Sequence, residues 1–333
     1  MRIVESAHYN IYIGKESLLE INLSNYSNVA ILVDNNTKEH CLPLFLTYIK
    51  DCNNPVVIEL PAGEQYKNYD SCRLIWKELL KNNFDRNSLL INLGGGVVGD
   101  IGGYCASTYK RGISFIQVPT TLIAMCDASV GGKLGFNFQG LKNQIGLFNN
   151  PSMVVIFAEF LETLKTGQLY SGYAEIIKHI LISDQGKWED LKSESFDNVN
   201  WEEKIFDSVK IKNSIVTEDY TEKGIRKKLN FGHTFGHAIE SYYISRGDTI
   251  LHGEAVFMGM IMESEISNIS TEEKIDIKNY ILSNFELPYF PNKSDLIQFM
   301  LNDKKNHSGK INFSLLDSIG NCVIDQLLPA DEI

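Results

Sequence analysis

The first half of the chain alternates short β-rich runs with helical patterns. Apolar runs of strand length occupy residues 29–34, 55–60, 88–93, 115–119 and 153–157, and segment 1–14 alternates like a strand. A helical spacing of apolar residues lies between these runs, as at 69–83. Strands that alternate with helices predict a mostly parallel sheet covered on both faces.

After about residue 158 the pattern changes to apolar residues three and four positions apart. It is clear at 171–182, 204–218, 233–243 and 252–266, and it predicts a mainly helical half. A chain of 333 residues also exceeds what one core usually supports. We expect an α/β protein with a Rossmann-like dinucleotide-binding domain at 1–158. A mainly α-helical metal- and substrate-binding domain at 159–333 would follow, with the site in the cleft between them.

Composition narrows the class of partner. The net charge is −11, from 31 Lys and Arg against 42 Asp and Glu, without the basic block that nucleic-acid binding requires. The six cysteines are scattered, the start lacks a signal peptide, and no apolar run approaches bilayer length. We expect a soluble, cytoplasmic protein that binds a small molecule and neither nucleic acid nor membrane.

A glycine-rich segment follows the run at 88–93. Gly94, Gly96 and Gly99 fit G-x-G-x-x-G between a predicted strand and helix, where backbone N–H groups can approach a pyrophosphate. An ordinary tight turn explains an isolated match about equally well. No acidic residue lies about 20 positions downstream to hold a ribose. Asp34 could take that role, while Glu64 and Lys67 in loop 61–67 give a weak, surface-like signal.

Three of the seven histidines fall within twenty residues. His233 and His237 are spaced i, i+4, so they share a helix face, and His252 begins the next helical pattern. A catalytic zinc site commonly combines histidine with a carboxylate. Each histidine alone is more often an ordinary core or surface residue, but the cluster favours a metal. The residues leave open which two histidines bind, and whether the carboxylate is Glu175, Glu240 or Glu254.

Single cations interrupt apolar or glycine-rich segments. A lone lysine usually extends into solvent from a helix. As a set, however, these cations predict a pocket for a phosphate and a carboxylate. They are Arg111, Lys133, Lys142, Lys178, Lys212 and Arg226.

Six motifs in this order resemble the 3-dehydroquinate synthases of the sugar phosphate cyclase family: GGGVVGD, PTTLIAMCDASVGGK, GLKNQIG, SGYAEIIKH, KLNFGHTFGHAIE and LHGEAV. The resemblance extends from about residue 30 to about 305. It implies a homodimeric lyase of the shikimate pathway that uses NAD and Zn²⁺ or Co²⁺. Such an enzyme makes 3-dehydroquinate and phosphate from 3-deoxy-D-arabino-heptulosonate 7-phosphate by transient oxidation, phosphate elimination, re-reduction and aldol cyclisation.

The resemblance also implies residue roles. Metal ligands fall on Glu175, His233 and His252, with His237 for proton transfer, and the catalytic set is His237, Lys133, Lys178, Glu222 and Asn143. Substrate-binding positions are Arg111, Lys133, Asn143, Lys178, Lys212, Arg226, Asn230 and Lys305, chosen over Lys304. NAD-binding positions are Asp34, Glu64, Lys67, Gly95, Gly96, Asp100, Thr120, Thr121, Asp127, Lys142, Phe160 and Thr163.

The sequence departs from the family pattern at a few positions. Leu134, Phe138 and Gln139 replace typically polar, His and Pro residues, and Gly167-Gln168 replaces an Arg-Glu pair. These changes bear on which sugar phosphate is the substrate. Other sugar phosphate cyclases, metal-dependent alcohol or glycerol dehydrogenases, and a non-catalytic NAD sensor are the alternatives. Three cations matched to a carboxylate, Lys133, Arg226 and Lys305, favour the heptulosonate phosphate.

Overall fold

The computed structural model describes residues 1–49, 54–139, 141–194, 196–301 and 310–333. The chain forms two compact units, one of residues 1–165 and 201–213 and the other of 166–200 and 214–333. The expected boundary at 158 therefore differs from the structure in two respects. Residues 158–163 stay with the first unit as a 3-10 helix whose Phe160 packs on Phe157, with ring centroids 5.1 Å apart. Residues 201–213 join it through contacts such as Asn213 Nδ2 to the Glu5 carbonyl, 2.8 Å.

In the described part of the first unit, seven strands form one sheet in the order β1-β2-β9-β6-β5-β3-β4. Within this sheet β1 and β2 pair antiparallel and the other described pairs are parallel. Every apolar run predicted as a strand forms a strand of this sheet. The strands are β1 Arg2–Glu5, β2 Asn10–Ile13, β3 Val29–Asp34, β4 Val56–Leu60, β5 Leu89–Gly94, β6 Ser114–Pro119 and β9 Met153–Ile156.

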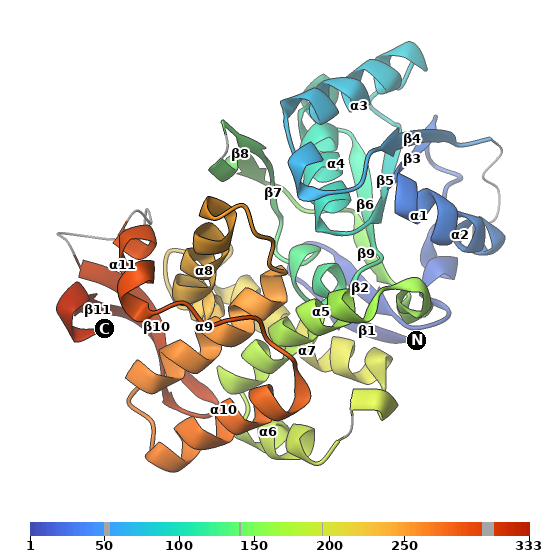
Figure 1. Cartoon of the computed structure of the whole chain (residues 1–333). Helices are drawn as coiled ribbons and strands as arrows, with labels where there is room; N and C mark the ends of the chain where they lie inside the picture. The colour runs from blue at the N-terminus through green and yellow to red at the C-terminus, as the bar shows by residue number, and fades with distance from the viewer. Residues whose placement is uncertain (50–53, 140, 195, 302–309) are drawn as a thin grey trace. The chain divides into compact units, whose positions relative to one another are not determined.

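Helices lie on both sides of this sheet, as a buried parallel sheet requires. Figure 1 shows α3 (Tyr69–Lys81) and α4 (Gly96–Thr108) on one side, and α1 (Asn35–His40) and α2 (Leu42–Tyr48) on the other. Leu90, Ile101 and Phe115 are among the core residues between α4 and the sheet. Hairpin β7–β8 (Lys133–Phe138 and Leu141–Phe148), which the patterns did not predict, packs against α4.

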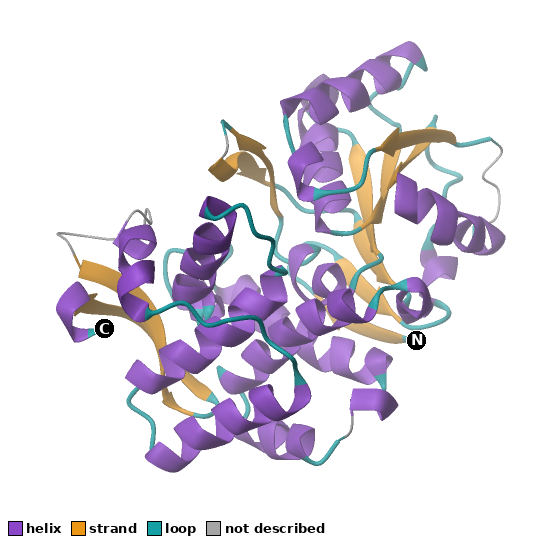
Figure 2. Cartoon of the chain, in the orientation of Figure 1, coloured by secondary structure: helices purple, strands orange, loops and turns teal. Residues whose placement is uncertain are grey.

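The second unit is mainly helical, as expected, and adds a β-hairpin (Figure 2). Its core includes Phe235, Met258 and Phe313. No helix of the described residues is long and apolar enough to span a membrane. The elements are α5 Thr166–Leu181, α6 Gln185–Lys192, α8 His233–Ser245, α9 His252–Ile266, α10 Thr271–Asn284, α11 Lys293–Leu301, β10 Lys310–Ser318 and β11 Asn321–Pro329. Helix α7 (Trp201–Glu218) contributes to both units.

Candidate active site

The glycine-rich segment lies where the sheet reverses its direction of growth. The chain proceeds from β3 outward to β4, and then returns to place β5 on the other side of β3. Strand β5 ends at Gly94, Gly95 precedes α4, and Asp34 ends β3. Open α/β sheets bind ligands outside the carboxyl ends of strands at such a switch point. The sequence motif therefore occurs at the place in this sheet that suits a dinucleotide.

Glycine at this turn permits close packing. A Cβ on Gly94 would lie 2.6 Å from the Val98 Cβ, and one on Gly95 would lie 3.1 Å from Thr121 Cγ2. Gly94, Gly95 and Gly96 line a recess with Asp100 and Ser129. The turn can thus present backbone N–H groups to an anion without side-chain obstruction.

Lys67 and Asp100, both predicted to contact NAD, meet beside this turn. Lys67 Nζ lies 2.5 Å from Asp100 Oδ2 and 2.7 Å from the amide oxygen of Asn143. Burial raises the pKa of Asp100, against the opposing effect of the Lys67 ammonium. Lys67 is itself buried, so the surface-like interpretation of loop 61–67 is wrong for this residue. Glu64 joins the group through Asn137, whose Nδ2 lies 2.8 Å from Glu64 Oε1.

The other positions predicted to bind NAD lie in the same unit, mostly at strand ends and in neighbouring turns. Thr120 and Thr121 follow β6, and Asp127 accepts a hydrogen bond from Lys212 Nζ at 2.5 Å. Asp34 Oδ1 caps α1 by accepting from the Thr37 amide at 2.8 Å, which leaves Oδ2 for a ligand. The remaining positions are Lys142, exposed on β8, and Phe160 and Thr163 in the 3-10 helix.

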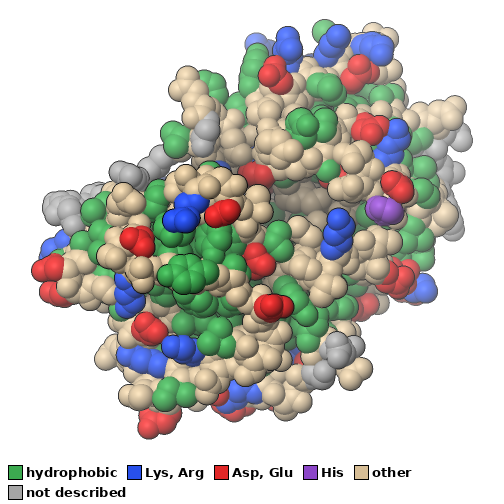
Figure 3. All heavy atoms as spheres, viewed as in Figure 1, with side chains coloured by type: hydrophobic (Ala, Val, Ile, Leu, Met, Phe, Trp, Pro, Cys, Tyr) green, Lys and Arg blue, Asp and Glu red, His purple; other side chains and the backbone are tan. Residues whose placement is uncertain are grey.

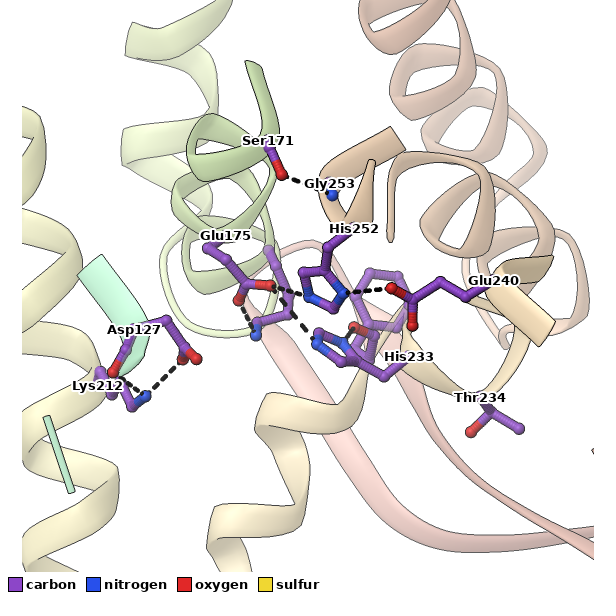
Figure 4. A network of polar contacts seen from close by, with 12 residues as sticks. Asp127, Ser171, Glu175, Lys212, His233, Thr234, Glu240, His252 and Gly253 are labelled. Carbon is purple, nitrogen blue, oxygen red and sulfur yellow. Dashed lines mark hydrogen bonds and ion pairs between the residues drawn. The ribbon is translucent and has the colours of Figure 1, made fainter. Parts of the chain in front are cut away.

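In the second unit, three predicted metal ligands converge from three helices. Glu175 comes from α5, His233 begins α8 and His252 begins α9. Their ligand atoms all lie within 4.8 Å of one another. Figure 4 shows the Glu175 carboxylate and the two rings turned toward one another, with Glu240 on the other side of His252. The local sequence delivers both rings to helix starts, where they project from the first turn.

The geometry of this cluster fits a divalent metal. Glu175 Oε1 is buried without a hydrogen bond among the described residues, and it lies 3.5 Å from His233 Nε2 and 3.4 Å from His252 Nε2. Ligands about 2.0–2.1 Å from a tetrahedral zinc ion are about 3.3 Å apart. The histidine side chains are 13% and 31% exposed, whereas that of Glu175 is 1% exposed. The cluster is therefore closed on the side of Glu175 and partly accessible on the side of the two rings.

Outer partners fix both rings in the orientation that metal binding needs. His233 Nδ1 lies 3.2 Å from the Phe231 carbonyl, and His252 Nδ1 lies 3.3 Å from Glu240 Oε1. Each ring therefore directs Nε2 at Glu175, and such outer contacts are typical of metal-binding histidines. Of the three carboxylates that the sequence left open, Glu254 instead accepts a hydrogen bond from the Leu251 amide at the start of its own helix.

The charges around the cluster favour ionised Glu175 and neutral His233. Burial opposes ionisation of Glu175, but the Lys178 ammonium and the two imidazoles outweigh it and hold its pKa well below its usual range. Burial and the same ammonium hold the pKa of His233 well below its usual value. Burial would lower the pKa of His252, but the two adjacent carboxylates, Glu175 and Glu240, raise it to about 9. Because Lys178 pairs with Glu175 Oε2, the position that a divalent cation could occupy lies between Glu175 Oε1 and the two Nε2 atoms.

Further predicted residues surround the cluster within the same unit. Lys178 is buried and forms an ion pair with Glu175, so it is not the solvated lysine that its type usually indicates. His237 is exposed, with its ring centroid 5.4 Å from that of His233. Asn230 Nδ2 donates to Glu222 Oε1 at 3.1 Å. His237, the residue predicted for proton transfer, therefore lies beside one of the predicted metal ligands.

Asp219 organises the loop that carries Glu222 and Arg226, and the sequence analysis missed it. Its carboxylate accepts from the backbone amides of Lys223, Gly224 and Arg226 at 3.0, 2.7 and 3.1 Å. These bonds outweigh burial and lower the pKa of Asp219. Arg226 is buried, and its Nη1 donates to the Tyr220 carbonyl at 2.5 Å. An aspartate ahead of a glycine-containing turn was the available signal.

Other predicted substrate positions lie in exposed segments or outside the described residues. Arg111 is exposed with a φ of +70°, and Lys133 is exposed on β7. Lys304 and Lys305 lie outside the described residues. Among the family departures, Leu134 is buried against Gly103, whereas Phe138 is 46% exposed beside Gln139 in the β7–β8 turn. Leu134 therefore serves the core. Gln168 is half-buried in the first turns of α5.

Comparison with known proteins identifies the family. Residues 57–171 match the profile described as 3-dehydroquinate synthase N-terminal, and residues 172–306 match the C-terminal profile. The 3-dehydroquinate synthase of Parabacteroides distasonis is 41% identical over 92% of this chain and 90% of its own. That of Campylobacter concisus is 37% identical over 99% of this chain and 95% of its own.

Solved structures share the fold. The structure of 2-deoxy-scyllo-inosose synthase complexed with carbaglucose-6-phosphate, NAD⁺ and Co²⁺ has a TM-score of 0.87, at 20% identity over 99% of this chain and 98% of its own. The 2-epi-5-epi-valiolone synthase from Streptomyces hygroscopicus, with NAD⁺ and Zn²⁺ bound, has a TM-score of 0.85, at 22% identity over 100% and 96%. An iron-containing alcohol dehydrogenase has a lower TM-score, 0.63.

Proposed function

The chain belongs to the 3-dehydroquinate synthase family, and from that premise we propose that it is a lyase that converts 3-deoxy-D-arabino-heptulosonate 7-phosphate to 3-dehydroquinate and phosphate. The observation that carries the proposal is the buried Oε1 of Glu175, which has no hydrogen bond among the described residues and faces His233 Nε2 and His252 Nε2. Lys178 already pairs with the other oxygen, Oε2, so Oε1 is the atom that stays costly to bury until a partner such as a metal ion binds it.

The bound groups supply the chemistry that side chains lack. When bound, Zn²⁺ or Co²⁺ would stabilise negative charge on substrate hydroxyl oxygens, and NAD⁺ would take up and return one hydride. Glu175, His233 and His252 would hold the ion. Gly95 and Gly96 would receive the pyrophosphate at the N-terminus of α4, with Asp34 at the ribose.

The chain's own residues would bind the substrate and move its protons. His237, exposed beside the ligand rings, would accept and return protons. Arg111, Lys142 and Asn143 would bind the phosphate, and Lys133 and Arg226 would bind the carboxylate, because paired cations offset the cost of burying these anions.

Phosphate release tests the proposal. We expect the protein with NAD⁺ and Co²⁺ to release phosphate from the heptulosonate phosphate, and a chelator to abolish that release. Release only from glucose 6-phosphate or sedoheptulose 7-phosphate would assign another cyclase activity. Net accumulation of NADH would indicate a dehydrogenase instead. The homodimer and the cytoplasmic location stay predictions, which sedimentation and cell fractionation would check.

A further inference from the structure

Helix α8 carries His233 and His237, but it lacks a cap from its own preceding residue. That residue is Gly232, which has a φ of +79° and no side chain to offer. The first amides of a helix have no partners within the helix and need an acceptor. Glu263 of α9 supplies it, since its carboxylate accepts from the amides of Gly232, Thr234 and Phe235 at 2.6, 2.9 and 3.1 Å.

This interaction is enclosed and closely packed. Glu263 is 0% exposed. A Cβ on Gly259, one turn earlier in α9, would lie 1.9 Å from the Gly232 carbonyl oxygen, and one on Gly232 would lie 2.6 Å from Met260 Cγ. The two backbones can approach this closely only with glycine at both positions. The start of α8 is thus fixed against the middle of α9.

The metal ligands lie at the ends of the two helices that this carboxylate joins. His233 stands between Gly232 and Thr234, two of the three residues whose amides Glu263 binds. His252 is the first residue of α9, the helix that bears Glu263. A shift of α8 along α9 would therefore change the distance between the two imidazole rings. The Nδ1 partners that the described residues supply to these rings are the Phe231 carbonyl and Glu240, so Glu263 would act through the helices.

We propose that Glu263 is a positioning residue that sets the spacing of His233 and His252 for the metal. The inference rests on the proposed function, because it presumes that this cluster binds a divalent ion. Glutamine at 263 would keep one acceptor oxygen but place an NH₂ group against an amide donor. The start of α8 would then lose at least one of its three bonds, and the charge that favours a helix N-terminus would disappear.

The test compares Glu263→Gln with Glu273→Gln in the full-length protein. Glu273 also binds two backbone amides, those of Ser270 and Ile319 at 2.9 and 3.0 Å, but it caps α10, a helix that carries none of the predicted metal ligands. We expect Glu263→Gln to raise the Co²⁺ dissociation constant about 10–100-fold, a typical effect of outer-shell changes, and to alter the visible spectrum of bound Co²⁺. Glu273→Gln should leave both unchanged.

Each outcome decides a separate claim. An unchanged Co²⁺ affinity and spectrum in Glu263→Gln would overturn the positioning role, as would equal changes in both variants. If the wild-type protein itself binds no Co²⁺, the proposed function fails first. If Glu263→Gln does not fold, Glu263→Asp replaces it, because aspartate keeps the charge with a shorter reach. A raised Co²⁺ dissociation constant in Glu263→Asp would then support the positioning role, and an unchanged one would overturn it.

Discussion

The Lys67–Asp100 pair permits a quantitative test of burial in the proposed nucleotide site. Replacement of Lys67 by Met removes an ammonium that lies 2.5 Å from Asp100 Oδ2 and 2.7 Å from Asn143 Oδ1. The two side chains of the pair are 6% and 20% exposed. Removal of the ammonium therefore leaves the Asp100 carboxylate mostly buried and without a counter-charge.

The expected loss of unfolding free energy in Lys67→Met follows from the exposed fractions of the two side chains. Breaking a fully buried ion pair costs about 3–5 kcal/mol, because the remaining charge is uncompensated. Asp100 retains some contact with water, so we expect the lower end of that range, about 3 kcal/mol of unfolding free energy. Lys38→Met is the matched control, because Lys38 lies 2.6 Å from Glu59 in the same unit with side chains 52% and 41% exposed. An exposed pair is worth about 0–1 kcal/mol.

The unfolding free energy lost in Lys67→Met should also depend on pH. The pKa of Asp100 is already raised, so the folded state binds its proton more tightly than the unfolded state does, and stability falls as pH rises through the window between the two pKa values. The Lys67 charge lowers the pKa of Asp100 in the folded state, so its removal raises that pKa and extends the pH range over which stability falls to higher pH. The penalty of Lys67→Met should therefore be smaller at about pH 5 than at about pH 8.

Urea denaturation of both variants at the two pH values measures these differences. A penalty for Lys67→Met no larger than that for Lys38→Met would refute the argument from burial. An equal penalty at both pH values would refute the argument from Asp100 ionisation, because protonation would then bring no relief. NAD⁺ affinity, measured in parallel, would show whether the pair also supports the cofactor.

Two further predictions concern packing and proton transfer. Gly102→Ala should lower the unfolding free energy by about 1–3 kcal/mol, because its Cβ would lie 1.9 Å from Asn92 Oδ1. Gly186→Ala, which meets only Asp184 Oδ1 at 3.4 Å, should not, and equal melting temperatures for the two variants would contradict this. His237→Ala should slow phosphate release about 10²–10⁴-fold while Co²⁺ affinity stays unchanged. A parallel loss of Co²⁺ affinity would make His237 a metal ligand instead.

Periodicity predicted the sheet well because each buried strand is a mostly apolar run, broken only by single polar residues such as Asn92 and Gln117. Strands β3, β5 and β6 and helix α3 lie within a few residues of their predicted ranges. Hairpin β7–β8 was missed because glycine interrupts both strands, at Gly135 and Gly146, and because much of β8 is exposed. Neither strand shows a clean alternation of apolar and polar residues.

Local pattern indicated the metal cluster but could not complete it. The i, i+4 spacing marked His233 and His237, yet the structure turns His233 toward Glu175 and leaves His237 exposed. Glu175 stands 58 residues before His233 in the chain, so only tertiary packing brings the two together. The roles of Glu240 and Glu263 likewise depend on how α8 and α9 pack, which spacing along one helix does not reveal.

The interspersed acidic and basic side chains on the face in Figure 3 agree with the scattered charges of the sequence.

Helix α7 has a consequence for synthesis of the chain. The ribosome releases the whole of segment 166–200, which belongs to the second unit, before Lys212 emerges to pair with Asp127 in the first. A nascent chain ending at 165 therefore contains every strand of the large sheet but lacks its last helical piece. Folding of the first unit must then finish late, after translation has already begun the second.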